Sequence, residues 1–411
     1  MPRAAFGAYR LREAERSFLP YARQHIDEDD IAAVAQALRG DYLTTGPAVE
    51  KFEAEFSEAV GAKDAVVCAS GTAALHLAAM ALGLGPGDQA VVPSVTFLAT
   101  ANVVRHVGAE VVFSDVDPET GMMRPDDLSA AYSKADVEKI KTIFPVCYAG
   151  QVPDREAIED TAKGRSIVYD SSHALASTYG NDGQVGDCGQ AVMETFSFHA
   201  IKTITTGEGG AVTTNDDELA ARLRRFRSHG MTRAAGEFEN GDLAFDRSGE
   251  SNPWYYEMTE PGHNYRLSDI QCALGSSQLR KLDDFAAARR RIARYYDVML
   301  ASLEPIVRPL SRQLECNPVW HLYAVHIDFA ALGLTRSQVM MRLKNVGIGT
   351  QVHYLPLHMQ PYFRRRYGEM SLPGAEAFYA GVLSLPLHVG MVEADVERVV
   401  EALASAVEMQ I

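Results

Sequence analysis

Cysteine is scarce in this chain of 411 residues, and its spacing offers no paired arrangement. Five cysteines occur, an odd number, and no two of them form a CxxC motif. A disulfide framework or a structural zinc site is therefore unexpected, and no metal site is predicted. Long hydrophobic runs are also missing, because charges or glycines interrupt each apolar stretch before it reaches membrane-spanning length. The leader "MPRAAFGAYRLREAERSFLP" lacks the apolar core of a signal peptide, so we expect a cytoplasmic protein without a membrane segment.

Basic residues are the minority charge. Lysine and arginine number 39 against 54 aspartates and glutamates, which gives a formal net charge of −15. That balance disfavours binding to nucleic acid or to an anionic membrane surface. It leaves room for a local basic pocket that holds an anionic small molecule. Apolar residues make up 47% of the chain, an ordinary share for a globular protein, and the length suits two domains.

Strand-like and helix-like segments alternate from residue 65 onward. Short apolar runs such as "AVVCAS", "QAVVPS", "EVVFSDVD", "SIVYD" and "AVMETFSF" are separated by segments with helical spacing such as "GTAALHLAAMALGLG". This alternation predicts an α/β fold with a mostly parallel sheet and helices on both faces. We place a large domain, with an N-terminal helical segment, at residues 20–262 and a smaller C-terminal α/β domain at residues 263–411.

Two features depart from the alternation. Residues 232–257 are polar, glycine-containing and aperiodic, which predicts a long surface excursion. The following stretch "LSDIQCALGSSQLRKLDDFAAARRRIARYYDVMLASL" has the spacing of a long helix, in which Gly275 is a candidate position for a break.

Two candidate ligand positions lie at predicted strand ends. In "CASGTAAL" a strand runs into Ser70, Gly71 and Thr72, and a helix begins at once. Free N–H groups at a helix N-terminus bind phosphate well, although an ordinary helix cap would look the same. "SIVYDSSHAL" ends a buried strand in Asp170, at the sheet edge where α/β proteins place ligands. The alternatives are that Asp170 caps the next helix and that His173, three residues on, packs in the core.

Lys202 is the third candidate. It stands in "SFHAIKTITTGEGG", among threonines and glycines that let the backbone approach closely. Most lysines are solvated, but a desolvated lysine amine can form a covalent bond with a carbonyl compound. A phosphate cradle, a strand-end aspartate and a sheltered lysine are together the three anchors that pyridoxal 5′-phosphate requires. The combination therefore predicts this cofactor.

Eight motifs, in order, carry a family resemblance. They are "SGTAAL", "TFLATANVV", "YAGQVPD", "YDSSHAL", "SFHAIKTITTGEGGAVTTND", "RSHGM", "GHNYRLSDIQCALG" and "QVHYLPLH". From about residue 20 to its end the chain resembles the DegT/DnrJ/EryC1/StrS family of sugar-nucleotide aminotransferases. The resemblance implies a fold-type-I, pyridoxal-phosphate-dependent enzyme. Histidine replaces the lysine in a related group of sugar deoxygenases, so Lys202 argues against that chemistry.

The resemblance assigns roles to particular residues. Lys202 matches the Schiff-base lysine, Asp170 the partner of the pyridine nitrogen, and His173 a residue at or near the ring. Phe97 matches the aromatic residue that stacks on the cofactor. The positions that match phosphate contacts are Gly71, Thr72, Ala73 and Ser197. Asn264 matches an asparagine that reaches the phosphate from a neighbouring subunit, which implies a homodimer with shared active sites. Candidate substrate-side residues are Thr44, Gln151, His229, His353 and Tyr354.

The substrate follows from the resemblance more narrowly. The segments "DSSHAL", "SFHAIK", "PWYYEM" and "QVHY" are most similar to the transaminases of pseudaminic acid and surface-glycan biosynthesis. These transfer an amino group from glutamate to C4 of a UDP-linked 4-keto-6-deoxy-N-acetylhexosamine. That branch tends to have "SAT" where this chain has Ser70, Gly71 and Thr72. Cation donors for the UDP group are sought among Arg227, Arg233 and the arginines at 364–366.

Two alternatives stay open at this point. One is an aminotransferase acting at C3 or C4 of a GDP- or dTDP-linked keto-hexose. The other is a non-catalytic protein that binds sugar nucleotides on the same scaffold, because a fold does not fix a function. Lys202 argues against the second alternative, since a mere binder has no need of an imine-forming lysine.

Overall fold

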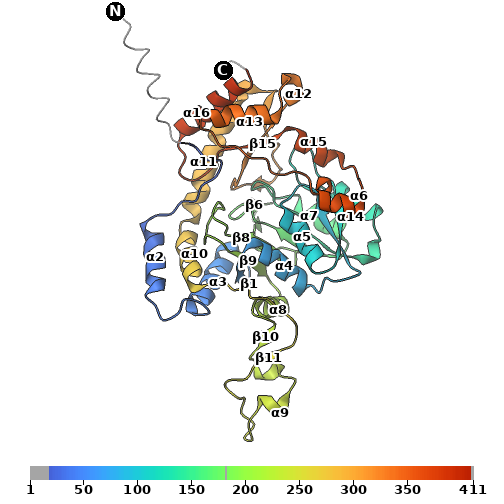
Figure 1. The fold of residues 1–411 in the computed structure, drawn as a ribbon, viewed down its shortest axis with the longest axis vertical. Coiled ribbons are helices and arrows are strands. Elements are labelled where there is room, and N and C mark those ends of the chain that lie inside the picture. Colours follow the sequence, from blue (N-terminus) through green and yellow to red (C-terminus); the bar gives the residue numbers. More distant parts are fainter. Residues whose placement is uncertain (1–17, 181–182, 409–411) are drawn as a thin grey trace, which may run out of the picture.

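The computed structural model describes residues 18–180 and 183–408, and a seven-stranded sheet lies at its centre (Figure 1). Most of the leader assessed for a signal peptide lies outside the described residues. In spatial order the strands are β1 (Asp64–Cys68), β9 (Gly210–Thr214), β8 (Met193–Ser197), β5 (Ser166–Asp170), β4 (Ile140–Ile143), β2 (Gln89–Pro93) and β3 (Glu110–Ser114). The pairs from β8 to β3 are parallel, and β9 runs antiparallel to both of its neighbours. The predicted mostly parallel α/β sheet is confirmed.

Both faces of this sheet are buried. Along β1, Val66 and Cys68 belong to one hydrophobic cluster, whereas Ala65 and Val67 belong to the other. Successive side chains of a strand point to opposite faces, so each face has its own core. The flanking helices are α3 (Pro47–Val60), α4 (Gly71–Ala81), α5 (Leu98–His106), α6 (Pro125–Ser133), α7 (Arg155–Ala162) and α8 (Asp217–Arg227). Helix α4 packs against α5, α8, β8 and β9 at once, which explains its almost wholly apolar sequence.

The C-terminal part of the chain builds a second, smaller sheet. Its strands are β12 (Val307–Pro309), β14 (Tyr323–Ile327) and β15 (Val382–Leu385), all antiparallel. The helices of this part are α11 (Leu282–Leu300), α12 (Phe329–Leu332), α13 (Arg336–Asn345), α14 (Pro361–Tyr367), α15 (Pro373–Gly381) and α16 (Glu393–Ala406). The N-terminal segment joins it, because Leu19 pairs with Ile348. The domain division at residue 262/263 stays a prediction.

The long helix expected after residue 266 is two helices. Helix α10 (Asp269–Leu279) packs against α2 (Glu28–Leu38) and α3, and α11 begins only three residues after α10 ends. Gly275 does not break the helix but lies inside α10, where an added Cβ would come within 2.5 Å of the Phe52 ring. The glycine thus permits the close approach of α10 to α3.

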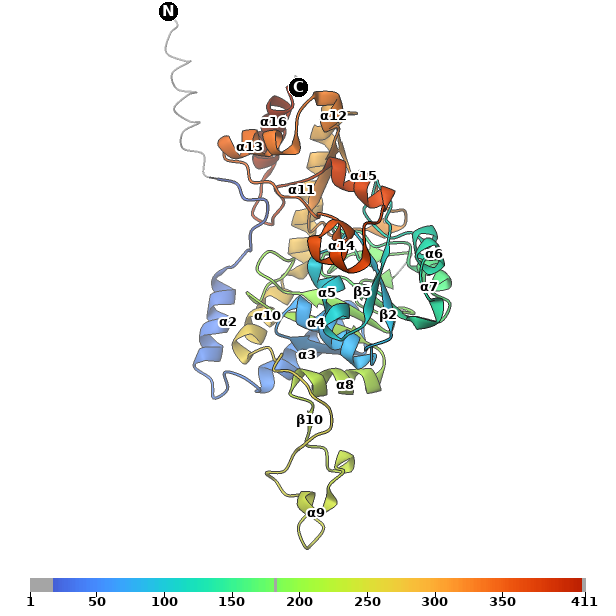
Figure 2. The ribbon, with the colours of Figure 1, turned by 45° about the vertical axis from the view of Figure 1, so that its right-hand side comes forward.

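Residues 232–257 form most of an arm that projects away from the body of the molecule (Figure 2). Strands β10 (Met231–Thr232) and β11 (Glu257–Met258) pair at its base, and it holds one short helix, α9 (Gly241–Ala244). Inside the arm the Phe238 ring lies 5.0 Å from that of Tyr255. Trp254 on the arm is 68% exposed. The predicted surface excursion is therefore a small folded projection.

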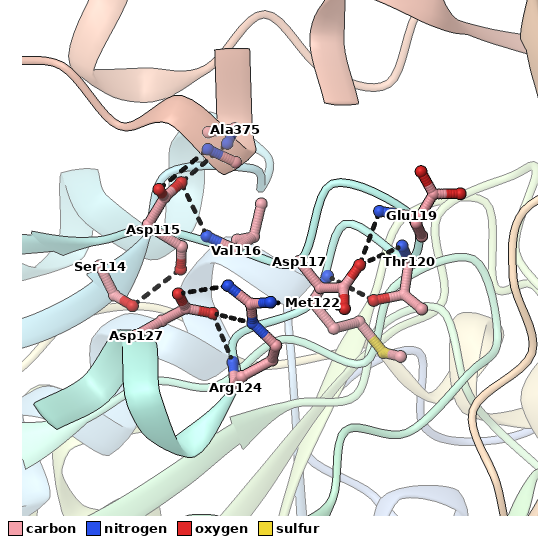
Figure 3. A network of polar contacts seen from close by, with 11 residues as sticks. Ser114, Asp115, Val116, Asp117, Glu119, Thr120, Met122, Arg124, Asp127 and Ala375 are labelled. Carbon is pink, nitrogen blue, oxygen red and sulfur yellow. Dashed lines mark hydrogen bonds and ion pairs between the residues drawn. The ribbon is translucent and has the colours of Figure 1, made fainter. Parts of the chain in front are cut away.

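A loop after β3 ties the two sheets' regions together (Figure 3). Asp115 accepts hydrogen bonds from the backbone N–H groups of Gly374 (2.9 Å) and Ala375 (2.7 Å), in the first turn of α15. Four residues on, Glu119 forms an ion pair with Arg308 of β12. The position of α15 and β12 relative to the central sheet is thus fixed by two carboxylates of one loop.

The remaining short elements are η1 (Val137–Lys139), β6 (Thr178–Tyr179), β7 (Gly183–Gln184), η2 (Ala235–Glu237), η3 (Ala301–Leu303), β13 (Cys316–Asn317) and η4 (Leu357–Met359). Within the described ranges, every helix is too short or too polar to span a bilayer. The same ranges hold no cluster of three or more histidine, cysteine or acidic side chains suited to a metal ion.

Candidate active site

A cavity of about 580 Å³ opens where β5 and β8 end and α4 begins. The segments that sequence reasoning singled out meet here. The predicted residues that line it are Gly71, Thr72, Phe97, Asp170, His173, Ser197, Lys202, His353 and Tyr354. They come from positions nearly 300 residues apart in the chain, and the parallel sheet brings its share of them to one edge.

Asp170 is the last residue of β5 and is only 5% exposed. Its Oδ2 accepts a hydrogen bond of 2.8 Å from Thr100 Oγ1 of α5, and its Oδ1 accepts one of 3.2 Å from the backbone N–H of Ser172. Two donors therefore hold the carboxylate in one orientation at the cavity wall. A carboxylate fixed in this way can accept the N–H of a protonated pyridine ring.

Lys202 lies in a turn after β8, where its backbone N–H donates to the carbonyl of His199 over 2.9 Å. The threonines that follow fold the loop, since Thr205 Oγ1 donates to the Phe198 carbonyl (3.2 Å) and Thr206 Oγ1 to the Glu208 carbonyl (2.8 Å). The run of threonines thus shapes the backbone around the lysine.

The electrostatic setting of Lys202 favours a neutral amine. Burial lowers the pKa of Lys202 to about 8; Asp170 opposes this shift and Arg289 adds to it. A lysine with that pKa holds a substantial neutral fraction near neutrality, which an ordinary lysine does not. The neutral amine is the form that attacks a carbonyl carbon or takes up a proton.

The N-terminus of α4 has the form of a phosphate site. Gly71 and Thr72 line the cavity at its first turn, where N–H groups have no carbonyl of a preceding turn to bond. An added Cβ at Gly71 would lie 2.7 Å from the Cβ of Ser197, so only glycine fits between the helix and β8. Ala73 lies one step further in, and its N–H already donates to Ser70 Oγ over 3.1 Å. The cap and phosphate interpretations are thus compatible.

Phe97 offers an aromatic face to the cavity. It precedes α5 as its N-cap residue and is 55% exposed, which is high for a phenylalanine. Its ring centroid lies 6.0 Å from that of Tyr354 on the opposite part of the wall. A flat heterocycle can stack on such a ring.

His173, His353 and Tyr354 also line the cavity. His173 Nδ1 accepts from the backbone N–H of Ala149 over 3.4 Å, so its Nε2 carries the proton and faces Tyr354 Oη at 3.2 Å. Burial, with Lys202 and His353 nearby, places the pKa of His173 well below its ordinary value. Burial and Lys202 lower the pKa of His353 to about 3. Both imidazoles are therefore neutral hydrogen-bonding groups at physiological pH.

Five predicted residues do not line this cavity, and Ala73, whose N–H group caps α4, is one of them. Gln151 is 1% exposed, and its amide bonds the 311–313 loop at both ends, through the Ser311 carbonyl (3.1 Å) and the Gln313 N–H (2.7 Å). Its role is to hold that loop. Thr44, His229 and Asn264 are exposed outside it.

The arginines sought for the nucleotide are also elsewhere. Arg227 pairs with Glu53 (2.5 Å) and donates to the Val67 carbonyl (2.8 Å) beneath the sheet, so its role is structural. Arg364 pairs with Glu369, and Arg366 pairs with Glu110. Arg365 and Arg366 line a separate hollow of about 820 Å³ beside β3, which shares no lining residue with the cavity that contains Lys202.

Sequence reasoning missed several side chains in the wall. Tyr21 comes from the N-terminal segment and His321 precedes β14 of the smaller sheet; Glu208 and Gln351 also line the cavity. His321 is only 2% exposed. His321 and Glu208 occur in the segments "HLYAVHIDF" and "GEGG", but only the packing of the two sheets shows that they line the same cavity as Lys202.

The geometry defines a pyridoxal-phosphate enzyme site, and the comparisons agree. The model of the DegT/DnrJ/EryC1/StrS aminotransferase family matches residues 24–404, and the chain belongs to this family. It is 38% identical to the spore coat polysaccharide biosynthesis protein SpsC of Bacillus subtilis over 95% of this chain and 97% of that protein.

Solved structures give the same assignment. PseC of Helicobacter pylori, an aminotransferase of pseudaminic acid biosynthesis, superposes with a TM-score of 0.85 at 32% identity, covering 95% of this chain and all of that one. The putative sugar aminotransferase Spr1654 of Streptococcus pneumoniae, in its pyridoxal-phosphate form, gives a TM-score of 0.84 at 29% identity, covering 95% and 99%. The chain is a pyridoxal-phosphate-dependent sugar aminotransferase.

The residues present fit this cofactor. The glycine at position 71 and the free first turn of α4 leave room for a phosphate, Thr100 fixes Asp170 in the cavity wall, and Lys202 lines the same cavity. When bound, the cofactor withdraws electrons from the carbon that carries the migrating amine. With the cofactor bound, Asp170 would supply an anion for the ring nitrogen and Lys202 an amine that can move a proton.

Proposed function

We propose that the chain transfers the amino group of glutamate to C4 of a UDP-linked 4-keto-6-deoxy-N-acetylhexosamine, as part of pseudaminic acid or surface-glycan biosynthesis. The observation that carries the proposal is the joining of Lys202, Asp170 and the α4 N-terminus in one cavity of about 580 Å³. The likeness over nearly the whole chain to PseC, an aminotransferase of pseudaminic acid biosynthesis, supports the proposed pathway.

In this proposal Lys202 Nζ removes the proton from the amino donor and returns it in the second half of the reaction, as one group serving as base and acid. Asp170 keeps the ring nitrogen protonated, and Thr100 keeps Asp170 in place. His173 and Tyr354 hydrogen-bond to each other in the wall of the same cavity. Gly71, Thr72 and Ser197 hold the phosphate, and the N–H group of Ala73 completes the N-terminal cap of α4.

The substrate test is product analysis with glutamate and a panel of keto-sugar nucleotides. We expect turnover of the UDP-linked 4-keto-N-acetylhexosamine and an amine at C4 of the product. Preference for a GDP- or dTDP-linked sugar, or an amine at C3, would contradict the proposed substrate. A spore-coat or other glycan sugar is the second candidate, since SpsC is 38% identical.

The lysine test is separate. Borohydride treatment of the purified yellow protein is expected to fix the cofactor on the peptide that contains Lys202. The Lys202→Ala protein is expected to be colourless after dialysis and inactive. An equally coloured and active Lys202→Ala protein would contradict the assignment.

We also propose a homodimer in which Asn264 reaches the phosphate in the partner's cavity. Asn264 is exposed and outside the cavity of its own chain, at the base of the projecting arm, where it pairs with Ser228. Mixing inactive Lys202→Ala and Asn264→Ala proteins tests this. Random exchange in a twofold dimer should restore about a quarter of the sites. A mixture no more active than its parts would contradict sharing.

A further inference from the structure

His321 is a buried cavity residue that the roles above leave unused. It precedes β14, is 2% exposed, and lines the cavity together with His173 and Lys202. Its ring centroid lies 4.4 Å from that of His173. A polar side chain buried this far needs a hydrogen-bond partner, because an unpaired buried polar group is costly.

The two nitrogens of His321 differ. Nδ1 is buried without a hydrogen-bond partner within residues 18–180 and 183–408. A proton on Nδ1 would be a buried donor without an acceptor, in a ring on which the positive charge of Arg289 also acts. Nε2 therefore carries the proton, and it is the nitrogen that can present an N–H group to the cavity. Burial and the neighbouring Lys202 lower the pKa of His321 far below its ordinary value, so the ring is neutral.

Arg289 lies behind His321. It comes from α11, is 1% exposed, and donates from Nη1 to the main-chain carbonyls of Trp320 (3.0 Å) and His321 (3.4 Å). Within the part of the chain that the structure describes, Arg289 has no carboxylate partner: burial alone acts on its pKa, lowering it to about 10, and its Nε has no hydrogen-bond partner. A buried cation without an anion creates a positive potential on the cavity side of His321.

An anion in the cavity would meet this potential. Asp170, the fixed acid of the wall, is already held by Thr100 and Ser172. Of the two substrates, the amino donor carries a carboxylate on the same carbon as the reacting amine, so this carboxylate must lie close to Lys202. The keto sugar has only neutral ring carbons beside its reacting carbon, and its diphosphate is several bonds away.

We propose that His321 Nε2–H, with Arg289 behind it, binds the α-carboxylate of the amino donor. The inference rests on the proposed function, in that it takes the donor to be a dicarboxylic amino acid such as glutamate. His321 acts as a direct ligand of the carboxylate. Arg289 is a positioning residue, which holds the backbone of His321 and supplies charge without touching the substrate.

The test separates the two half-reactions in the cofactor-loaded enzyme. Stopped-flow absorbance gives the glutamate concentration for half-maximal rate, and calorimetry gives the affinity for glutarate, an unreactive dicarboxylate. For His321→Leu we expect both to weaken roughly tenfold to a hundredfold, the effect of losing one hydrogen bond to a charged group. Sugar-nucleotide affinity should change by less than about twofold, a shift below the value of a lost hydrogen bond.

Two further variants guard against a folding effect. His321→Gln keeps an N–H donor and should retain most of the glutamate affinity. His358→Leu removes another histidine that is 2% exposed, which bonds Ser94 Oγ at 2.6 Å outside the cavity, and should leave glutamate affinity unchanged. Cofactor absorbance confirms that each protein is loaded.

The outcomes are decisive in either direction. If His321→Leu bound glutamate and glutarate as tightly as His358→Leu does, the inference would be overturned. It would also be overturned if His321→Leu lost affinity for glutamate and for the sugar nucleotide to the same extent. A wild-type enzyme that binds neither glutamate nor glutarate would also overturn it. Failure of every keto-sugar nucleotide to accept the amine, with a normal glutamate half-reaction, would instead overturn the proposed function alone.

Discussion

The hydroxyl of Thr100 donates its proton to Oδ2 of Asp170 over 2.8 Å, and both side chains are buried. Thr96 Oγ1 lies 3.0 Å from the same Thr100 oxygen. A hydroxyl has one proton to give, so Thr96 must be the donor of the second bond. The hydrogen bonds from Thr96 to Thr100 and from Thr100 to Asp170 therefore fix the carboxylate that we propose as the partner of the cofactor's ring nitrogen.

Replacing Thr100 with valine is expected to leave the fold intact and to weaken the site. Valine has nearly the same shape but no hydroxyl, and a hydrogen bond to a charged group contributes about 1.5–3 kcal/mol. Cofactor affinity, measured by dialysis and absorbance, should fall roughly tenfold or more, and the glutamate half-reaction should slow with it. Thr100→Ser keeps the donor and serves as control; identical behaviour of the two variants would contradict the role.

The pKa of Lys202 predicts how cofactor-free protein recaptures its cofactor. Only the neutral amine attacks the aldehyde, and burial lowers the pKa of Lys202 to about 8 from 10.5. The amine is protonated below that pH, so the capture rate should rise through pH 8 and level off near pH 9. Stopped-flow absorbance measures it. A rate that keeps rising to pH 10 would show an ordinary lysine.

Much of this site follows from local sequence. The positions of Asp170 and of the Ser70–Thr72 turn depend on where a strand ends and a helix begins, and hydrophobic patterns show that directly. Lys202 was recognisable because cofactor chemistry requires a third group in addition to these two. The parallel order of the strands then brings the ends of β5 and β8 to the same sheet edge.

What the sequence could not show is the docking of distant segments. Gln151 has a motif position like that of a substrate residue, yet its side chain bonds the 311–313 loop, a contact with no signature in spacing. Arg227, which the sequence suggested as a nucleotide contact, likewise forms an ion pair with Glu53. His321 lines the cavity because the smaller sheet packs against the larger one, so its position in the sequence did not indicate a role in the site.

Gly71→Ala tests the closeness of α4 to β8. The new Cβ would lie 2.7 Å from the Cβ of Ser197, so one of the two elements must shift. We expect destabilisation of about 1–3 kcal/mol, the usual effect of overpacking. Cofactor affinity should fall as well, because the displaced turn carries the phosphate-binding N–H groups.

The control for this variant is Gly241→Ala. Gly241 begins α9 on the arm, and nothing lies within 4 Å of its added Cβ. Its free energy of unfolding should stay within about 0.5 kcal/mol of wild type. Chemical denaturation followed by circular dichroism gives both values. Equal stability and equal cofactor affinity in the two variants would contradict a tight α4–β8 contact.

Asp115 is expected to act on the site from a distance. It caps α15 through the N–H groups of Gly374 and Ala375 (Figure 3). The Phe378 ring of α15 meets the Tyr148 ring edge-on at 5.5 Å, and Tyr148 Oη donates to the His353 carbonyl over 2.5 Å. A shift of α15 therefore reaches the cavity wall through packed groups.

Asp115→Ala should lower the free energy of unfolding by about 1–3 kcal/mol, because two helix N–H groups lose their acceptor. It should also raise the glutamate concentration for half-maximal rate, since His353 and Tyr354 line the donor's cavity. Asp126→Ala, an exposed acid at the start of α6, is the matched control and should change neither quantity. Loss of stability with unchanged glutamate kinetics would show that the cap stabilises α15 without positioning the wall.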